Sequence, residues 1–252
     1  MIRAFYSAAS GMRAQQQSID VCSNNIANLG TVGFKKSAAS FSDNIYDVYM
    51  DAEDGETGIR IGNGSRVDSV LRDFRQGNIY DTGNPLDLAI VGDGFFVVDN
   101  GMGERYYTRD GSFRLSVEPQ GVYMVTASGD YLLDDNGNRI LLTAADVESL
   151  EIDSTGLIRG QGTADVRIGL VTFPNPGGLE AVGGNLYRQT IASGQTLEQG
   201  AVSIKQYSLE SSNADLIEEI TNMLKAQRAF QLSSRVVQAA DEMEGTANNM
   251  RT

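Results

Sequence analysis

The sequence of 252 residues contains no histidine and no tryptophan, and it has only one cysteine and four prolines. Without histidine, the chain lacks the side chain that most often serves as an acid–base catalyst or metal ligand. The single cysteine, Cys22, excludes a disulfide within the chain and leaves the redox compartment open. No apolar run approaches the roughly 20 residues of a membrane span, and no cleaved signal peptide is expected.

Positive charge is also scarce. The 20 lysines and arginines face 33 acidic residues, for a net charge of −13, which disfavours nucleic acid or an anionic membrane as a partner. The hydrophobic content of 41% is enough for a real core, and 28 glycines indicate many tight turns. The length fits one large domain or two modest ones.

The most regular pattern lies at the start of the chain, from Ile2 to Leu29. One apolar residue recurs there every seven positions: Phe5, Met12, Ile19 and Ile26. Such a repeat keeps one stripe of a helix facing a partner. Because helices gain most of their stability from a docked face, the pattern predicts an N-terminal helix that needs a partner.

The best candidate for that partner lies at the other end, in residues 212–250. The same interval separates its main apolar positions, Leu216, Met223, Phe230 and Val237. Further residues widen the stripe: Ile220, Ala226, Ala240, Met243, Ala247 and Met250. Ser212 followed by Asp215 predicts a capping box that opens the helix. We therefore expect the two ends to pair as a coiled coil. The alternative, that both stripes are the outer layer of an ordinary core, stays open.

The middle of the chain has a different pattern. Short apolar and alternating segments recur about every ten residues and are separated by Asn-Gly and Asp-Gly turns, which predicts an antiparallel β-domain. The expected fold is therefore a mainly β central domain flanked by N- and C-terminal α-helices that pair as a coiled coil. Its expected parts are an N-terminal helix in 1–30, a connecting segment with an extended loop or hairpin in 31–66, a β-rich body in 67–209 and a C-terminal helix in 210–252.

Two motifs imitate catalytic or metal sites. Asp81-Thr82-Gly83 has the spelling of an aspartic protease triplet, but that chemistry needs two carboxylates that share a proton, and only one triplet is present. Asp134, Asn136 and Asn138 resemble the start of a calcium loop that lacks its glycine and its bidentate glutamate. Both are interpreted as turns. No catalytic residue, cofactor or metal ion is expected.

A set of motifs resembles one known family. The first is Ser23-Asn24-Asn25-Ile26-Ala27-Asn28 with Thr31, Gly33, Phe34 and Lys35; the others are Gln76-Gly77-Asn78, Pro85 to Ile90, Gly92 to Phe96, Tyr107 to Phe113, Gly177 to Leu179, Gly184 to Tyr187 with Ser193-Gly194, Leu209 to Asn213 and Gln227-Arg228-Ala229. They look like the signatures of the bacterial flagellar axial proteins, which are the rod, hook and hook-associated subunits. Short amide side chains such as Asn24, Asn25 and Asn28 can bond the backbone where a helix ends.

The resemblance implies a structural subunit of the flagellar basal-body rod. In that family the terminal helices line a helical tube that transmits torque and through which axial proteins are exported, and the β-domain lies outside. The implied partners are copies of the chain, adjoining rod and hook subunits, the surrounding bushing rings and the export apparatus. The two apolar stripes and the three asparagines would form the assembly interface.

The subtype stays open at the level of sequence. The length and the run from Gln76 to Phe113 look most like a rod subunit of the distal type, whereas Asp241 to Asn248 looks more like the proximal type. A hook-type subunit is a further alternative within the family. Outside it, the alternatives are a surface binding module or a hydrolase that uses Asp81.

Overall fold

The structure is a computed structural model that describes residues 2–48, 60–119, 121–142, 150–159, 166–198 and 202–250. The chain forms two compact units. The helical unit comprises Met1–Ala27, Ser37–Arg72 and Asp215–Thr252, and the body comprises Asn28–Lys36 and Asp73–Ala214. Neither described helix has the stretch of apolar sequence that a bilayer crossing requires.

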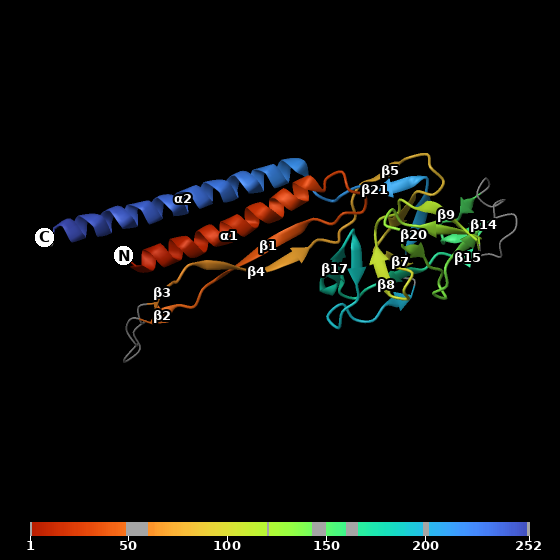
Figure 1. Ribbon diagram of the computed structural model, residues 1–252, viewed down its shortest axis with the longest axis horizontal. Coiled ribbons are helices and arrows are strands. Elements are labelled where there is room, and N and C mark those ends of the chain that lie inside the picture. The colour runs from red at the N-terminus through yellow and green to blue at the C-terminus, as the bar shows by residue number, and fades with distance from the viewer. Residues whose placement is uncertain are drawn as a thin grey trace. The chain divides into compact units, whose positions relative to one another are not determined.

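Two long helices dominate the helical unit. Helix α1 spans Ile2–Ala27 and helix α2 spans Leu216–Asn249. They lie side by side and antiparallel, with both chain ends at the same end of the pair (Figure 1). The expected N- and C-terminal helices and their pairing are confirmed.

The predicted capping box at Ser212 is wrong. Helix α2 starts after Asp215, whose side chain accepts hydrogen bonds from the backbone N–H groups of Ile217 at 2.8 Å and Glu218 at 3.3 Å. Three residues before Ser212, the chain still belongs to strand β21, Ser208–Glu210. The backbone therefore turns into the helix later than the sequence pattern suggested.

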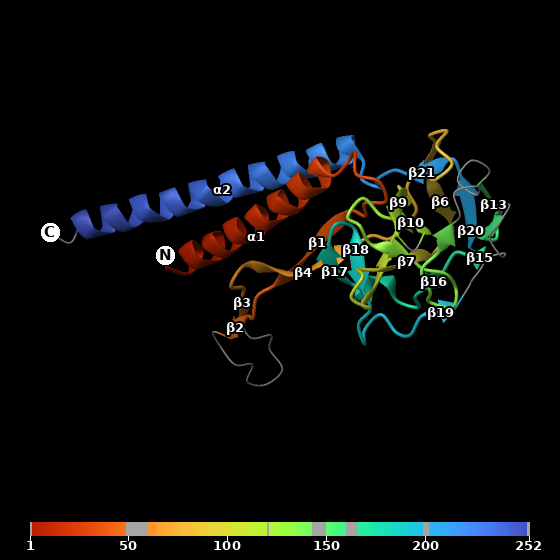
Figure 2. The ribbon, with the colours of Figure 1, turned by 45° about the vertical axis from the view of Figure 1, so that its right-hand side comes forward.

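A β-hairpin completes the helical unit and packs along α1 (Figure 2). Strand β1, Ser37–Asp43, pairs antiparallel with β4, Ser65–Arg72, and the short strands β2, Asp47–Val48, and β3, Arg60–Ile61, extend the hairpin. Residues 67–72, expected to open the body, belong to this hairpin. Residues 49–59 of the expected connecting segment lie outside the described residues.

The body consists of short strands, and every pairing among its described residues is antiparallel, as predicted. Its largest sheet has ten strands. The strands are β5 Ile79–Asp81, β6 Leu88–Val91, β7 Phe95–Asp99, β8 Arg105–Thr108, β9 Arg114–Glu118, β10 Gly121–Val125, β11 Tyr131–Leu132, β12 Leu141–Leu142, β13 Glu151–Ile152, β14 Leu157–Arg159, β15 Val166–Arg167, β16 Leu170–Thr172, β17 Glu180–Gly183, β18 Leu186–Arg188, β19 Leu197–Glu198, β20 Ser203–Gln206 and β21, with one short 3₁₀ helix at Pro176–Gly178.

Strand β7 is buried on both faces, which explains its continuous apolar sequence. Because side chains alternate along a strand, Phe96 and Val98 enter the larger core cluster, and Phe95 and Val97 enter a second cluster with Tyr107, Phe173 and Tyr187. The aromatic rings of the second cluster meet edge to face, for example Phe95 and Phe173 at 5.6 Å between centroids.

A buried ion network closes the body around Glu210. The Lys35 Nζ lies 2.6 Å from Glu210 Oε1 and donates to the carbonyl oxygen of Arg75 at 2.8 Å, and the guanidinium of Arg109 lies 3.2 Å from Glu210 Oε2. The N–H of Gly77 also donates to Glu210 at 2.7 Å. Burial, reinforced by the charge of Arg109, lowers the pKa of Lys35 although Glu210 acts in the opposite direction.

Gly33 allows the close approach that this network needs. Its φ is +66°, and a Cβ at this position would lie 2.6 Å from the backbone carbonyl carbon of Arg109. The N–H of Gly33 donates to the backbone carbonyl of Glu210 at 2.8 Å. Segments from both ends of the sequence therefore complete the body.

We predict that Lys35→Met destabilises the full chain by on the order of 3 kcal/mol, because it leaves a buried carboxylate with one of its two cations. The shift is measured as a lower urea midpoint of the body, followed by tyrosine fluorescence, since the ten tyrosines are not masked by tryptophan.

The matched control is Lys205→Met. Lys205 forms an exposed ion pair with Asp81 at 2.7 Å, and exposed pairs contribute little to stability. Its urea midpoint should stay close to that of the unaltered chain. Equal shifts in the two variants would contradict a special role for the buried network.

Candidate assembly interface

The seam between α1 and α2 is filled by small and polar side chains. Ala8 and Cys22 of α1 and Ala226 and Ala240 of α2 are buried. A Cβ on Gly11 would lie 3.5 Å from the Ser233 hydroxyl, so these two residues face each other across the seam. Small side chains allow a close approach of the helices, but they bury little apolar surface.

Two contacts fix the register of the pair. Gly11 faces Ser233, and the Asn25 amide donates to a Glu219 carboxylate oxygen at 3.0 Å. Gly11 lies fourteen residues before Asn25, and Ser233 lies fourteen residues after Glu219. The same antiparallel register therefore holds over four helical turns.

Asn25 also bonds the first residue of β1 in the way that a neighbouring strand would. Its amide nitrogen donates to the carbonyl oxygen of Ser37 at 2.7 Å, and its carbonyl oxygen accepts from the N–H of Ser37 at 2.9 Å. Asn25 is fully buried, and through Glu219 it fixes the end of α1, the start of β1 and the first turns of α2 relative to one another.

The other two asparagines of the motif have different positions. Asn24 is exposed on the last turns of α1. Asn28 follows the helix, where its backbone carbonyl accepts from the N–H of Thr31 at 3.2 Å and its side chain accepts from the Thr31 hydroxyl at 3.1 Å. Asn28 therefore performs the helix-ending role expected of a short amide.

Cys22 lies in the same buried polar region. Burial, with a further contribution from the Glu219 carboxylate, raises the pKa of its thiol to about 11. The thiol therefore stays protonated near neutral pH, and protonated thiols are poor nucleophiles. This environment agrees with a buried seam residue and not with a reactive cysteine.

The predicted apolar stripes flank this seam and do not fill it, which corrects the position expected from the sequence. Six of their residues are half-buried: Met12, Ile19, Ile26, Met223, Phe230 and Val237. Three are more exposed, with Phe5 at 46%, Leu216 at 47% and Ile220 at 42%. At about 100° per residue, the stripe of α1 lies roughly 90° around the helix from the small residues that face α2. The close approach of the backbones leaves the larger side chains at the margin.

Both stripes lie on the same side of the pair. The register brings Met12 level with Phe230 and Ile19 level with Met223. The β-hairpin contacts α1 on the other side, since a Cβ on Gly64 would meet Ser7 and Ser10. The stripe side is therefore left open by the hairpin.

Along residues 5–26 of α1 and 216–237 of α2, this open side carries no ionisable side chain in its helical rows; beyond Val237 the rows of α2 continue with Asp241 and Glu244. We call the charge-free part the uncharged face, and it consists of Phe5, Ala9, Met12, Gln16, Ile19, Ser23 and Ile26 of α1 and Leu216, Ile220, Met223, Gln227, Phe230, Ser234 and Val237 of α2. In a chain with 53 charged residues, such a row is unusual for a solvated surface. Depletion of charge is the compositional mark of the core of a protein interface.

The environment of Asp81 does not fit acid catalysis. Its carboxylate lies 2.7 Å from Lys205 Nζ and accepts from the Ser208 hydroxyl at 2.8 Å. The hydrogen bonds from Lys205 and Ser208 lower the pKa of Asp81, whereas a carboxyl that shares a proton needs a raised one. The hydrolase interpretation therefore has no support in this geometry.

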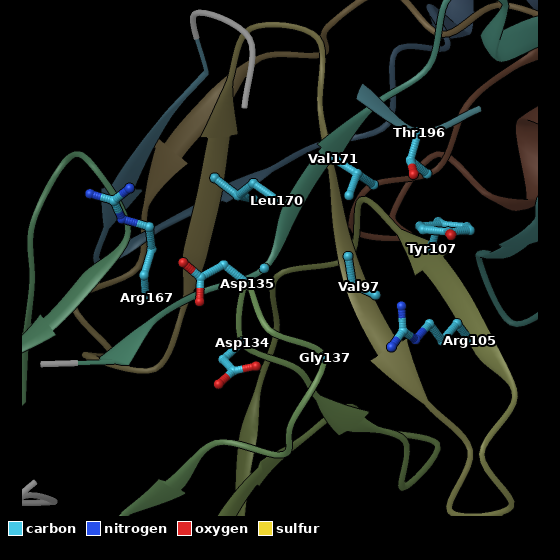
Figure 3. Close-up of a pocket in the computed structure, with 11 residues that line it drawn as sticks. Val97, Arg105, Tyr107, Asp134, Asp135, Gly137, Arg167, Leu170, Val171 and Thr196 are labelled. Atoms are coloured by element: carbon cyan, nitrogen blue, oxygen red, sulfur yellow. The ribbon is translucent and has the colours of Figure 1, made fainter. Parts of the chain in front are cut away.

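The body contains a hollow of about 400 Å³ (Figure 3). Arg105 and Tyr107 lie on one wall, and Asp135 and Gly137 lie on the facing loop (Figure 3). The neighbouring Asp134 carboxylate accepts from the N–H of Asn138 and so closes the turn that resembled a calcium loop. Across the described residues there is no group of three or more His, Cys, Asp or Glu side chains that could hold a metal ion.

Comparison with known families gives three matches along the chain. Residues 5–35 match the model described as flagella basal body rod protein, and residues 89–160 match the flagellar hook protein FlgE/F/G D1 domain. Residues 205–250 match the flagellar basal body rod FlgEFG protein C-terminal model. The three matches cover α1, the central strands of the body and α2.

Individual relatives match over their whole length. The flagellar basal-body rod protein FlgG of Caulobacter vibrioides is 39% identical over 270 residues, which covers 100% of both chains. The protein of the same name from Borreliella burgdorferi is 35% identical and covers 100% of this chain and 99% of the relative. That of Bacillus subtilis is 38% identical over 96% of this chain and 97% of the relative. The chain therefore belongs to the family of flagellar basal-body rod proteins.

Proposed function

We propose that this chain is a structural subunit of the flagellar basal-body rod, of the distal type, and that copies join through the uncharged face of the helix pair. Similarity to rod proteins along the full length supports the rod assignment. The observation that supports the interface is the charge-free double row on one side of α1 and α2. The role is structural and not catalytic.

The assignment as a rod subunit also implies which partners the chain contacts. They are copies of the chain, the adjoining rod and hook subunits, the surrounding bushing rings and the flagellar export apparatus. The subunit would reside in the basal body and form a helical tube that transmits torque from motor to hook and through which axial proteins pass. The two helices supply the inner wall of this tube.

The helix pair gains stability when it assembles. Its seam buries mainly alanine, glycine, serine and one cysteine, so the pair alone lacks the large apolar burial that normally holds helices together. On the uncharged face, each large apolar side chain that becomes fully buried contributes about 1.5–3 kcal/mol before ordering costs. A neighbouring copy on this face therefore supplies the apolar burial that the seam lacks. Pairing of the two helices and polymerisation of the subunit are thus coupled.

Met12→Asp and Phe230→Asp, each made alone, should prevent rod assembly, because each places a carboxylate in the centre of the uncharged face. The measurement is the presence of rods in basal bodies isolated from cells that carry the variant as their only copy. The body should stay folded in the purified variants, with an unchanged urea midpoint.

Gln17→Asp is the control, since Gln17 is exposed and lies on the opposite side of α1. It adds the same charge to the same helix and should assemble normally. Normal rods from either Met12→Asp or Phe230→Asp would refute the uncharged face as the contact between copies.

A further inference from the structure

Helix α2 separates its charges along its length. From Ile220 to Ala240 its only charged residues are bases, namely Lys225, Arg228 and Arg235. From Asp241 to Met250 its only charged residues are acids, namely Asp241, Glu242 and Glu244. All six residues are exposed, and none of them has an ion-pair partner among the residues that the structure describes.

The three acids form what we call the acidic end of α2, and they are unfavourable for an isolated helix. Asp241 and Glu244 are three positions apart, so they are neighbours on the helix surface and their charges repel each other. The last turn of α2 has no basic residue that would offset the negative end of the helix dipole. Bases supplied by another chain would relieve this repulsion.

The acidic end is open on the side that faces α1 elsewhere. The register of the helix pair places Ile2, the first residue of α1, level with Glu242. Helix α2 therefore runs on past that end of α1 (Figure 1). Glu244 lies about one helical turn after Ala240, which is buried in the seam, but Glu244 itself is exposed.

The bases lie on the other side of α2. Arg228 and Arg235 are seven positions apart and therefore share one side of the helix, which we call the basic side. At about 100° per residue, this side lies roughly opposite Ala226, which is buried in the seam with α1. Leu224 and Leu232 flank the two arginines and are 49% and 61% exposed. The basic side is therefore turned away from α1.

The basic side and the acidic end suit one contact between copies. In an open polymer, each copy presents one surface to the neighbour on one side and a different surface to the neighbour on the other. The basic side points away from α1, whereas Asp241 and Glu244 lie toward the α1 side of α2. Copies placed side by side in the same orientation therefore bring the two surfaces face to face. Exposed apolar residues lie beside the charges on both surfaces, with Leu232 on one and Met243 on the other.

We propose that the basic side of α2 in one copy binds the acidic end of α2 in an adjacent copy. Arg228 pairs with Asp241 of the neighbouring copy, and Arg235 pairs with its Glu244. Asp241 follows Arg228 by thirteen residues and Glu244 follows Arg235 by nine, so adjacent copies are offset along the helix by roughly 14–20 Å, at about 1.5 Å per residue.

The inference rests on the proposed function, since it assumes that copies of the chain assemble into a rod. It adds an offset between copies that the uncharged face does not set, because apolar burial is non-directional. Exposed ion pairs contribute little affinity, whereas complementary charges fix the register of an interface. The charge pairs therefore select how adjacent copies are staggered.

The test exchanges the charges of the two surfaces. Arg228→Glu with Arg235→Glu, and separately Asp241→Lys with Glu244→Lys, each set like charges against each other. Each twofold variant should lower the yield of rods in isolated basal bodies at least tenfold, because juxtaposed like charges are strongly unfavourable. The variant with all four substitutions faces opposite charges again, so its yield should return to within about twofold of that of the unaltered chain.

A matched control separates local pairing from net charge. Arg228→Glu and Arg235→Glu are combined with Asp135→Lys and Glu151→Lys, which replace two exposed acids of the body. This control has the same net charge as the fourfold exchange, but its new lysines are not on α2, so its rod yield should stay low. The urea midpoint of the body should be unchanged in every variant confined to α2.

Co-expression of the two twofold variants is a second measurement that does not require the fourfold variant to fold. One chain then presents two acidic surfaces and the other presents two basic surfaces, so the two chains are complementary in alternation. Rods should form from two chains that fail when each is expressed alone.

Normal rods from either twofold variant, or from the control, would overturn this inference. Absence of rods from both the fourfold exchange and the co-expressed chains would overturn it too, and would indicate an acidic partner other than a second copy, because an exchange within α2 cannot restore binding to such a partner. The proposed function survives these outcomes. It fails if the unaltered chain does not enter rods.

Discussion

The seam of small residues between α1 and α2 is the constraint on which the rest of the helical unit depends. Gly11 against Ser233 and the buried Asn25–Glu219 hydrogen bond bring the helices close together and fix their register. The same closeness displaces the large apolar residues to one side, where they form a charge-free row. A pair that is precise in register but poor in buried apolar area is suited to a subunit that becomes stable in contact with its neighbours.

The body follows a related principle. Its largest core cluster is built from central strands, but its closure needs Lys35 from the N-terminal region and Glu210 from the C-terminal region. Both residues are fully buried, so neither charge is satisfied until the two segments and Arg109 are in place. Residues that follow α1 and residues that precede α2 thus belong to the body, and folding of the body brings together segments from Asn28 to Ala214.

Several features of this architecture follow from the sequence because they are local or periodic. The seven-residue repeats predict both helices, and Asn-Gly and Asp-Gly turns with apolar alternation predict antiparallel strands. Other features depend on contacts between distant residues. A second heptad of small residues, Ala226, Ser233 and Ala240, forms the actual seam, and the sequence alone does not show that these residues face α1 in place of the large ones. The ion network joins Lys35, Arg109 and Glu210, which no local spacing connects.

The central claim is that the helix pair is only weakly stable in the isolated subunit and is stabilised by assembly, and the reactivity of Cys22 tests this claim without any substitution. Buried in the seam, this thiol has a pKa near 11 and is shielded from reagents. Its rate of maleimide labelling near neutral pH can be measured in dilute unassembled protein, in rods and in urea. We expect the unassembled subunit to label more slowly than the urea-unfolded chain, and rods to label far more slowly than the unassembled subunit. Equal protection of Cys22 in the dilute subunit and in rods would contradict the account.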